Sequence, residues 1–188
     1  MNSREIKKQL GREFFIIYND INPVIQELNL EKDAKILDIG TGKGRMAITL
    51  ALNGYRVITG EPESDESEYA KQDWQKDAKE VNVDNLITFK SFDAETMPFE
   101  DSYFDAVFIL GAFHHMEDPS TAFKECIRIT KSDGIICAIE PDPKRIEIIR
   151  QQIPTHPDSI NPKQYSEELF VKMNKGLMFN SYIFKKNS

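Results

Sequence analysis

The sequence has few cysteines and no long apolar run. Only two of its 188 residues are cysteine, Cys126 and Cys137, and they do not form a CxxC pair. We therefore expect two reduced core residues and no disulfide framework. No run of about 18 apolar residues occurs, and the first residues lack the apolar stretch of a signal peptide. These absences predict a cytoplasmic protein without membrane insertion.

Positive charge is also scarce. The chain has 24 Lys and Arg residues against 31 Asp and Glu residues, which gives a formal net charge of −7. Nucleic-acid binding relies on clustered Lys and Arg to neutralise phosphates. The charge balance therefore predicts no nucleic-acid partner.

The length predicts a single domain, residues 1–188, with three parts. Residues 1–30 are expected to form a helical lid or packing segment, residues 31–142 a cofactor-binding core, and residues 143–188 a shortened C-terminal part. An abbreviated C-terminal strand region is expected because only "GLMFNSYIFKKNS" follows residue 175.

Five apolar runs bounded by turn signals predict strands, at residues 35–39, 55–60, 86–92, 104–110 and 134–140. Stretches with helical spacing lie between most of them. They include a polar surface helix at 64–80 and a helix with Asp118 as N-cap and Pro119 at its first position. A last helix is expected near 166–175. The alternation predicts an α/β fold: a doubly wound, mostly parallel, Rossmann-like sheet with helices on both faces.

The stretch "KILDIGTGKGRMAITLALNGYRVITGE" joins the first two predicted strands. Glycine lets a ligand approach the backbone closely, and a helix N-terminus favours an anionic group. Glu61 ends the second strand at a spacing that suits hydrogen bonds from ribose hydroxyls. The pattern indicates a nucleoside with an anionic group. It departs from the dinucleotide fingerprint GxGxxG, since Arg45 stands at the position of the third glycine.

These segments resemble the class I S-adenosylmethionine (SAM)-dependent methyltransferases. "LDIGTGKGR" is similar to their motif I and "VITGE" to their motif II, and "FKSFDAETMPFEDSYFDAVFILGAFHHMEDP" and "RITKSDGIICAIEP" are similar to later signature segments. The resemblance covers roughly residues 34–142, in order. Within the class it points to the small-molecule branch that includes quinone-biosynthesis methylases.

The resemblance implies S-adenosyl-L-methionine as cofactor and gives each site residue a role. Asp38 would position the ammonium of the methionine tail, Glu61 would hold the ribose, and Asp93 would accept from the adenine amine. The remaining expected contacts are backbone or apolar, at Gly40, Thr41, Gly42, Gly44, Ala94, Met97 and Gly111. For Asp93, residue chemistry alone also allows a carboxylate that caps a local turn.

Two histidines follow the fourth predicted strand in "GAFHHMEDP". An imidazole has a pKa suited to removing a proton from an acceptor, so His114 or His115 is a candidate general base. We expect adjacent side chains to point apart and not into one pocket, which allows at most one of them this role. They could also be polar turn residues. A metal site formed by His114, His115 and Glu117 is not expected, because neighbouring histidines rarely supply converging ligands and the usual i, i+4 helical spacing is absent. His156, in a proline-rich loop, is expected to be solvated.

The sequence predicts a methyltransferase that acts on a small-molecule acceptor. Two alternatives remain open: a SAM-binding protein without catalysis, and an NAD-dependent oxidoreductase, which Arg45 disfavours. An exposed apolar edge at the end of the sheet would also permit a homodimer.

Overall fold

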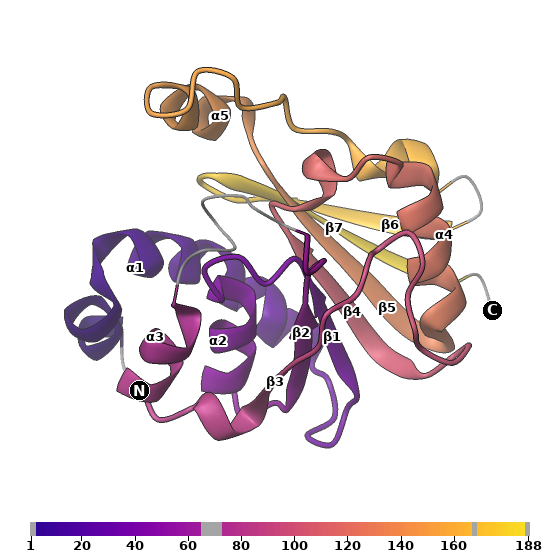
Figure 1. The fold of residues 1–188 in the computed structure, drawn as a ribbon, viewed down its shortest axis with the longest axis horizontal. Coiled ribbons are helices and arrows are strands. Elements are labelled where there is room, and N and C mark those ends of the chain that lie inside the picture. Colours follow the sequence, from indigo (N-terminus) through magenta and orange to yellow (C-terminus); the bar gives the residue numbers. More distant parts are fainter. Residues whose placement is uncertain (1–2, 65–72, 167–168, 187–188) are drawn as a thin grey trace.

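The computed structural model describes residues 3–64, 73–166 and 169–186, and its strands form one sheet (Figure 1). The strands are β1 (Ile36–Ile39), β2 (Val57–Gly60), β3 (Ile87–Phe89), β4 (Phe104–Leu110), β5 (Thr130–Pro141), β6 (Leu169–Lys175) and β7 (Phe179–Lys186). Their order in the sheet is β3-β2-β1-β4-β5-β7-β6. The pairs from β3 to β5 are parallel and both pairs of β7 are antiparallel. The predicted doubly wound fold is confirmed.

Helices cover both faces of this sheet (Figure 1). The helices are α1 (Ser3–Leu28), α2 (Arg45–Leu52), α3 (Trp74–Glu80), α4 (Pro119–Ile129) and α5 (Pro143–Arg150), with short 3-10 turns η1 (Asp84–Leu86), η2 (Phe113–His115) and η3 (Pro162–Tyr165). The first three helices contribute to one apolar core and α4 to the other. Helix α1 contains a kink at Gly11, so it consists of two helical pieces.

Neighbouring strand residues face opposite cores. Ile36 belongs to the core under α1 and α2, whereas Leu37 belongs to the core under α4, and Phe108 and Ile109 divide in the same way. All four are buried. Side chains alternate across a strand, so a sheet covered on both sides needs continuous apolar runs. This explains why the strands read as unbroken apolar stretches.

The carboxyl ends of the parallel strands meet at one edge of the sheet. Ile39 at the end of β1 pairs with Gly60 of β2 and with Ile109 of β4. Leu110 of β4 pairs with Ile139 of β5. The residues that follow these strands therefore lie along the same edge, where ligands bind in open α/β sheets.

Two helix predictions can be compared with the structure. The helix expected from Asp118 is confirmed as α4, because Pro119 is its first residue and the Asp118 carboxylate accepts from the backbone N–H groups of Ser120 and Thr121. For the surface helix expected at 64–80, residues 65–72 lie outside the described part of the chain. The described remainder forms α3, with Asp73 as its N-cap.

The prediction for the C-terminal region is wrong in two respects. Residues 169–175 form a strand, β6, where a helix was expected, and β6 and β7 make a complete hairpin, so the strand region is not abbreviated. Asp20 of α1 holds the turn of this hairpin: its carboxylate accepts from the backbone N–H groups of Leu177, Met178 and Phe179. A contact between α1 and residues almost 160 positions later stabilises the hairpin.

Both cysteines are buried and unpaired, as expected. Burial raises the pKa of each thiol to about 12, which keeps both protonated. Among the helices of the described residues, none combines the length and the apolar character needed to cross a bilayer.

Candidate functional site

The glycine turn after β1 brings bare backbone to the carboxyl edge of the sheet. Gly40 has a φ of 83°, and a Cβ added there would lie 2.5 Å from the Cβ of Ala112 in the turn after β4. The backbone N–H of Gly42 donates to Oε2 of Glu61 at 2.8 Å. The structure therefore brings the glycine turn into direct contact with Glu61. Gly44 has a different role, because an added Cβ would lie 2.7 Å from the Cβ of Trp74; it allows α3 to pack closely.

Asp38 lies fully buried beneath this turn. Its Oδ2 accepts from the Thr59 hydroxyl at 2.8 Å, and Thr59 is 2.9 Å from the Thr41 hydroxyl. Its other oxygen, Oδ1, is buried without a hydrogen-bond partner. Burial raises the pKa of Asp38 to about 7; the Thr59 hydroxyl and the backbone N–H of Ala47 oppose this, and the nearby Glu61 adds to it. A buried carboxylate oxygen without a partner is suited to a donor or cation brought by a ligand.

Thr59 was not among the predicted site residues. The parallel register of β1 and β2 pairs Asp38 with Thr59, so both side chains lie on the same face of the sheet. The sequence signal was the position of Thr59, two residues before Glu61.

The segment predicted to contact adenine is attached to α4. Ala94 and Met97 are buried, whereas Asp93 is exposed, and its Oδ1 accepts from the backbone N–H of Glu95 at 2.8 Å. That contact is the local turn role that the residue chemistry allowed. The Met97 N–H donates to the Glu125 carboxylate, and Arg128 donates to the Met97 carbonyl.

The N-terminal helix is tied to the glycine turn by Glu13. Its carboxylate lies 2.8 Å from the Arg45 guanidinium, 3.7 Å from Lys43 and 3.5 Å from Arg145. Burial raises the pKa of Glu13, but the three cations lower it by more, so the pKa lies below its usual value. Arg45, which replaces the third glycine of the dinucleotide fingerprint, therefore anchors α1.

Both predicted histidines lie in η2, directly after β4. His114 is buried, and its Nδ1 is 2.5 Å from Oε2 of Glu140, which is also buried. Burial raises the pKa of Glu140, and the hydrogen bond and charge of His114 oppose this. His115 is exposed, yet its ring centroid is 4.2 Å from that of His114. The expectation that adjacent histidines point apart is wrong.

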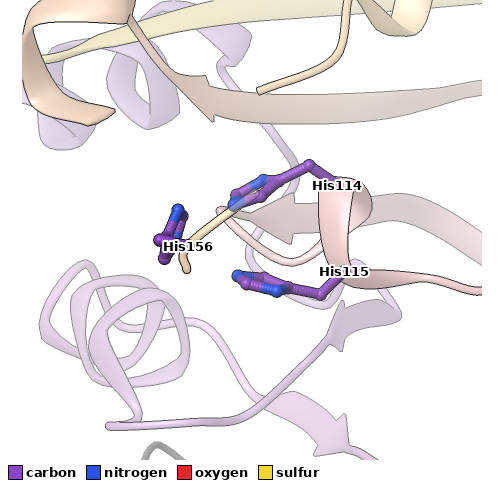
Figure 2. Close-up of side chains that lie close together, drawn as sticks. All are labelled: His114, His115 and His156. Atoms are coloured by element: carbon purple, nitrogen blue, oxygen red, sulfur yellow. The ribbon is translucent and has the colours of Figure 1, made fainter. Parts of the chain in front are cut away.

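A third histidine joins this pair. His156, expected to be solvated in its loop, is buried, and its ring centroid lies 5.2 Å from that of His114 and 5.0 Å from that of His115. Figure 2 shows the rings of His114 and His115 extending from η2 toward His156. No periodic pattern predicts this contact, because His156 lies 41 positions after His115 in the chain.

The comparison with protein families identifies the family of this chain. The family described as "Methyltransferase domain" matches residues 37–138, which contain the glycine turn, Asp38, Glu61 and both histidines of η2. The chain belongs to this methyltransferase domain family. Membership implies S-adenosyl-L-methionine as the methyl donor. It therefore argues against the alternative that the chain is an NAD-dependent oxidoreductase.

Individual relatives agree with the family. The chain is 28% identical to 27-O-demethylrifamycin SV methyltransferase of Amycolatopsis mediterranei, over 67% of this chain and 47% of that protein. It is 28% identical to demethylmenaquinone methyltransferase of Staphylococcus haemolyticus, over 68% of this chain and 52% of that protein. The chain thus spans about half the length of these curated relatives.

A solved structure matches nearly the whole fold. It is that of a candidate S-adenosyl-L-methionine-dependent methyltransferase from Methanococcus maripaludis, with a TM-score of 0.69 and 23% identity, covering 98% of this chain and 90% of that one. At this identity the likeness shows that the two methyltransferase domains share a fold.

Proposed function

We propose that this methyltransferase domain transfers a methyl group from S-adenosyl-L-methionine to a small-molecule acceptor. One observation carries the proposal: the partnerless Oδ1 of buried Asp38 lies in a site whose glycine turn is joined to Glu61. When bound, the donor supplies a methyl group already activated by its sulfonium. The protein's task is then to bind, align and exclude water.

The cofactor contacts follow from the charges and backbone groups of the site. Asp38 would pair with the ammonium of the methionine tail, and Gly40, Thr41 and Gly42 would place backbone against that tail. Glu61, already held by the Gly42 N–H, would accept from ribose hydroxyls. Gly44 supports the turn through its contact with Trp74.

The adenine end would lie against the 93–97 segment. The buried Ala94 and Met97 would provide an apolar wall and a backbone donor. Asp93 is exposed and would accept from the adenine amine, in addition to its bond with the Glu95 N–H.

The acceptor would enter near η2, where the turn after β4 follows Gly111. His114 has its Nδ1 engaged by Glu140 and its side chain only 2% exposed, so it is poorly placed to exchange protons with solvent. His115 is exposed and is the better candidate for proton removal in the metal-free protein.

Methyl transfer itself gives the direct test. Purified protein with methyl-labelled donor should release S-adenosyl-L-homocysteine and label an acceptor from a panel of phenols, hydroquinones and demethylated naphthoquinols, the last suggested by the named relatives. If the protein binds the donor but transfers no methyl group to any acceptor offered, including fractions of a cell extract, the alternative of a SAM-binding protein without catalysis is favoured.

Gly111→Ala should separate the transfer step from stability. Gly111 has a φ of 60°, and an added Cβ would have no protein atom within 4 Å. The positive φ should cost about 1–2 kcal/mol of stability. The methyl group would also occupy space beside the reacting atoms, and misplacing them should lower kcat by about 100-fold.

Gly54→Ala is the matched control for this variant. Gly54 has a φ of 86°, and the nearest atom to an added Cβ is Nζ of Lys32 at 3.8 Å. It should lose similar stability in thermal unfolding while keeping its kcat. If the two variants lose kcat equally, Gly111 does not lie beside the reacting atoms.

Cofactor binding should release a proton below about pH 7. The pKa of Asp38 in the ligand-free protein is about 7, because burial disfavours the carboxylate. A bound ammonium favours the carboxylate, so affinity should rise with pH through this range. Calorimetry of S-adenosyl-L-homocysteine at about pH 6.5, in two buffers of different ionisation enthalpy, measures the release.

Asp38→Asn provides the control, since it should abolish that proton release. Equal heats in both buffers for the unaltered protein would contradict the assignment.

The raised pKa of Asp38 also affects stability. The folded state holds the Asp38 proton more tightly than the unfolded state, so this group's contribution to the stability of the ligand-free protein falls as pH rises from about 4 to about 7.

A homodimer is also proposed, through the β6 edge of the sheet. β6 is the last strand in the sheet order, and Phe170 and Met173 on it are 62% and 44% exposed. Exposed apolar edge strands favour pairing with a second chain.

A further inference from the structure

All three histidines of the sequence meet at one place. The chain contains three histidines, two from η2 and one from the loop after α5. One ring nitrogen from each lies within 4.8 Å of those from the other two. Figure 2 shows the three side chains gathered around a common space. Chance placement of every histidine in one cluster would be unusual, and imidazole is a common metal ligand.

His114 is oriented as a metal ligand would be. Oε1 of Glu140 accepts from the Phe113 N–H at 3.3 Å, and Oε2 lies 2.5 Å from Nδ1 of His114. When Glu140 is ionised, Nδ1 of His114 carries the hydrogen and Nε2 keeps its lone pair. Nε2 of His114 is buried and has no partner. A histidine whose other ring nitrogen donates to a carboxylate is the usual arrangement at metal sites.

His156 is fixed in a comparable way. Its Nδ1 lies 2.9 Å from the Pro157 carbonyl, which can only accept, so Nδ1 carries the hydrogen and Nε2 keeps its lone pair. Arg150 donates to the His156 carbonyl at 2.8 Å and pairs with Asp158, which holds this part of the loop in place.

We propose that His114, His115 and His156 bind one divalent transition-metal ion, with Zn²⁺ the best match to three imidazoles. Zn–N bonds of about 2.0–2.1 Å in a tetrahedral site place ligand nitrogens about 3.4 Å apart. Nitrogens within 4.8 Å reach that spacing by side-chain rotations of on the order of an ångström. Glu140 and the Pro157 carbonyl are the outer partners that orient two of the ligands.

Three protein ligands leave one position of a tetrahedral ion open. Structural zinc sites are closed by four protein ligands, whereas sites that bind small molecules have three. Among the described residues, no other His, Cys, Asp or Glu joins this cluster as a possible ligand. The open position would take water or an anionic oxygen or sulfur atom of a bound molecule. The metal site does not depend on the proposed methyl transfer.

Metal binding by the chelator-treated full chain tests the proposal. Titration with Zn²⁺ at about pH 7.5 should show one ion per chain, with X-ray absorption showing nitrogen ligands at about 2.0–2.1 Å. Substitution with Co²⁺ should produce the visible absorption of a tetrahedral ion. His156→Ala and His115→Ala should each weaken Zn²⁺ binding by more than the about 10–100-fold typical of losing an outer partner.

Two further variants sharpen the result. Glu140→Gln should weaken Zn²⁺ binding by about 10–100-fold, because it alters the orientation and basicity of His114 without removing a ligand. Glu117→Gln changes an exposed acid two residues from His115 and should leave the affinity unchanged. His114→Gln is preferred to alanine at the buried position because it keeps most of the side-chain volume.

Three outcomes would overturn the proposal. They are the absence of stoichiometric Zn²⁺ and Co²⁺ binding by the unaltered chain, undiminished binding by His156→Ala, and sulfur ligands in the absorption spectrum. S-adenosyl-L-homocysteine binding is measured on the same samples with and without metal. If it persists while metal binding fails, the histidines form an imidazole cluster without metal and the proposed function is unaffected.

Discussion

Asp38→Asn is expected to weaken binding of S-adenosyl-L-homocysteine by at least about 100-fold, since leaving one member of a buried ion pair unmatched costs about 3–5 kcal/mol. Asparagine keeps the size of the side chain and can still accept the Thr59 hydroxyl hydrogen bond. It cannot supply the negative charge that the buried Oδ1 would offer to an ammonium. Calorimetry on the folded variant measures the loss.

A truncated ligand serves as the control for this prediction. 5′-Methylthioadenosine has the nucleoside and the sulfur but no amino-acid tail, so its affinity should be unchanged in Asp38→Asn. Glu61→Gln should weaken both ligands, because both contain the ribose. If Asp38→Asn weakens the truncated ligand as much as the complete one, Asp38 supports the turn and does not recognise the tail.

Gly60→Ala should have the largest effect on stability. Gly60 ends β2, and an added Cβ would lie 1.9 Å from the Lys90 carbonyl oxygen and 2.4 Å from the Phe92 ring. The Lys90 backbone cannot retreat freely, because its N–H donates to the Thr59 carbonyl at 2.9 Å. Overpacking of this kind costs about 3 kcal/mol, and each kcal/mol lowers Tm by about 2–4 °C in a chain of this size.

Thermal unfolding of Gly60→Ala beside Gly111→Ala separates the two causes of strain. Gly111→Ala has an unfavourable φ but no clash, so its Tm should fall by less. If the Tm of Gly60→Ala falls no further than that of Gly111→Ala, the β2–β3 connection adjusts readily. The close approach of Gly60 to Lys90 and Phe92 is then not required.

The core of the fold was predictable because its signals are local. Each of the first five strands contains a short apolar run, and their helices carry caps such as Asp118. The glycine turn and Glu61 could be placed at one edge because parallel strands share a direction. The contact between Glu61 and Gly42 is the expected consequence.

Residues 143–188 carry weaker signals. The β6 sequence "LFVKMNK" contains residues that suit a helix, but the strand gains its hydrogen bonds from β7 and its turn from Asp20, far away in the sequence. Long-range pairing overrides local propensity in such segments. Helix α5 did have a local signal that was missed: Asp142 followed by Pro143 repeats the Asp118 and Pro119 pattern.

The histidine cluster could not be predicted from spacing. Metal-site patterns in sequences depend on ligands a few residues apart on one element, whereas His156 comes from a loop that folds back over η2. The assumption that neighbouring side chains diverge holds for strands, and η2 is a 3-10 turn in which His114 and His115 lie side by side.

The proposed function requires that the glycine turn, Asp38 and Glu61 form a SAM site. Calorimetric titration of the purified chain with S-adenosyl-L-homocysteine, with NAD⁺ titrated in parallel, tests it most directly. We expect one molecule of S-adenosyl-L-homocysteine to bind per chain and NAD⁺ to produce no measurable heat. Heat only with NAD⁺, or none with S-adenosyl-L-homocysteine across about pH 6 to 8, would contradict it.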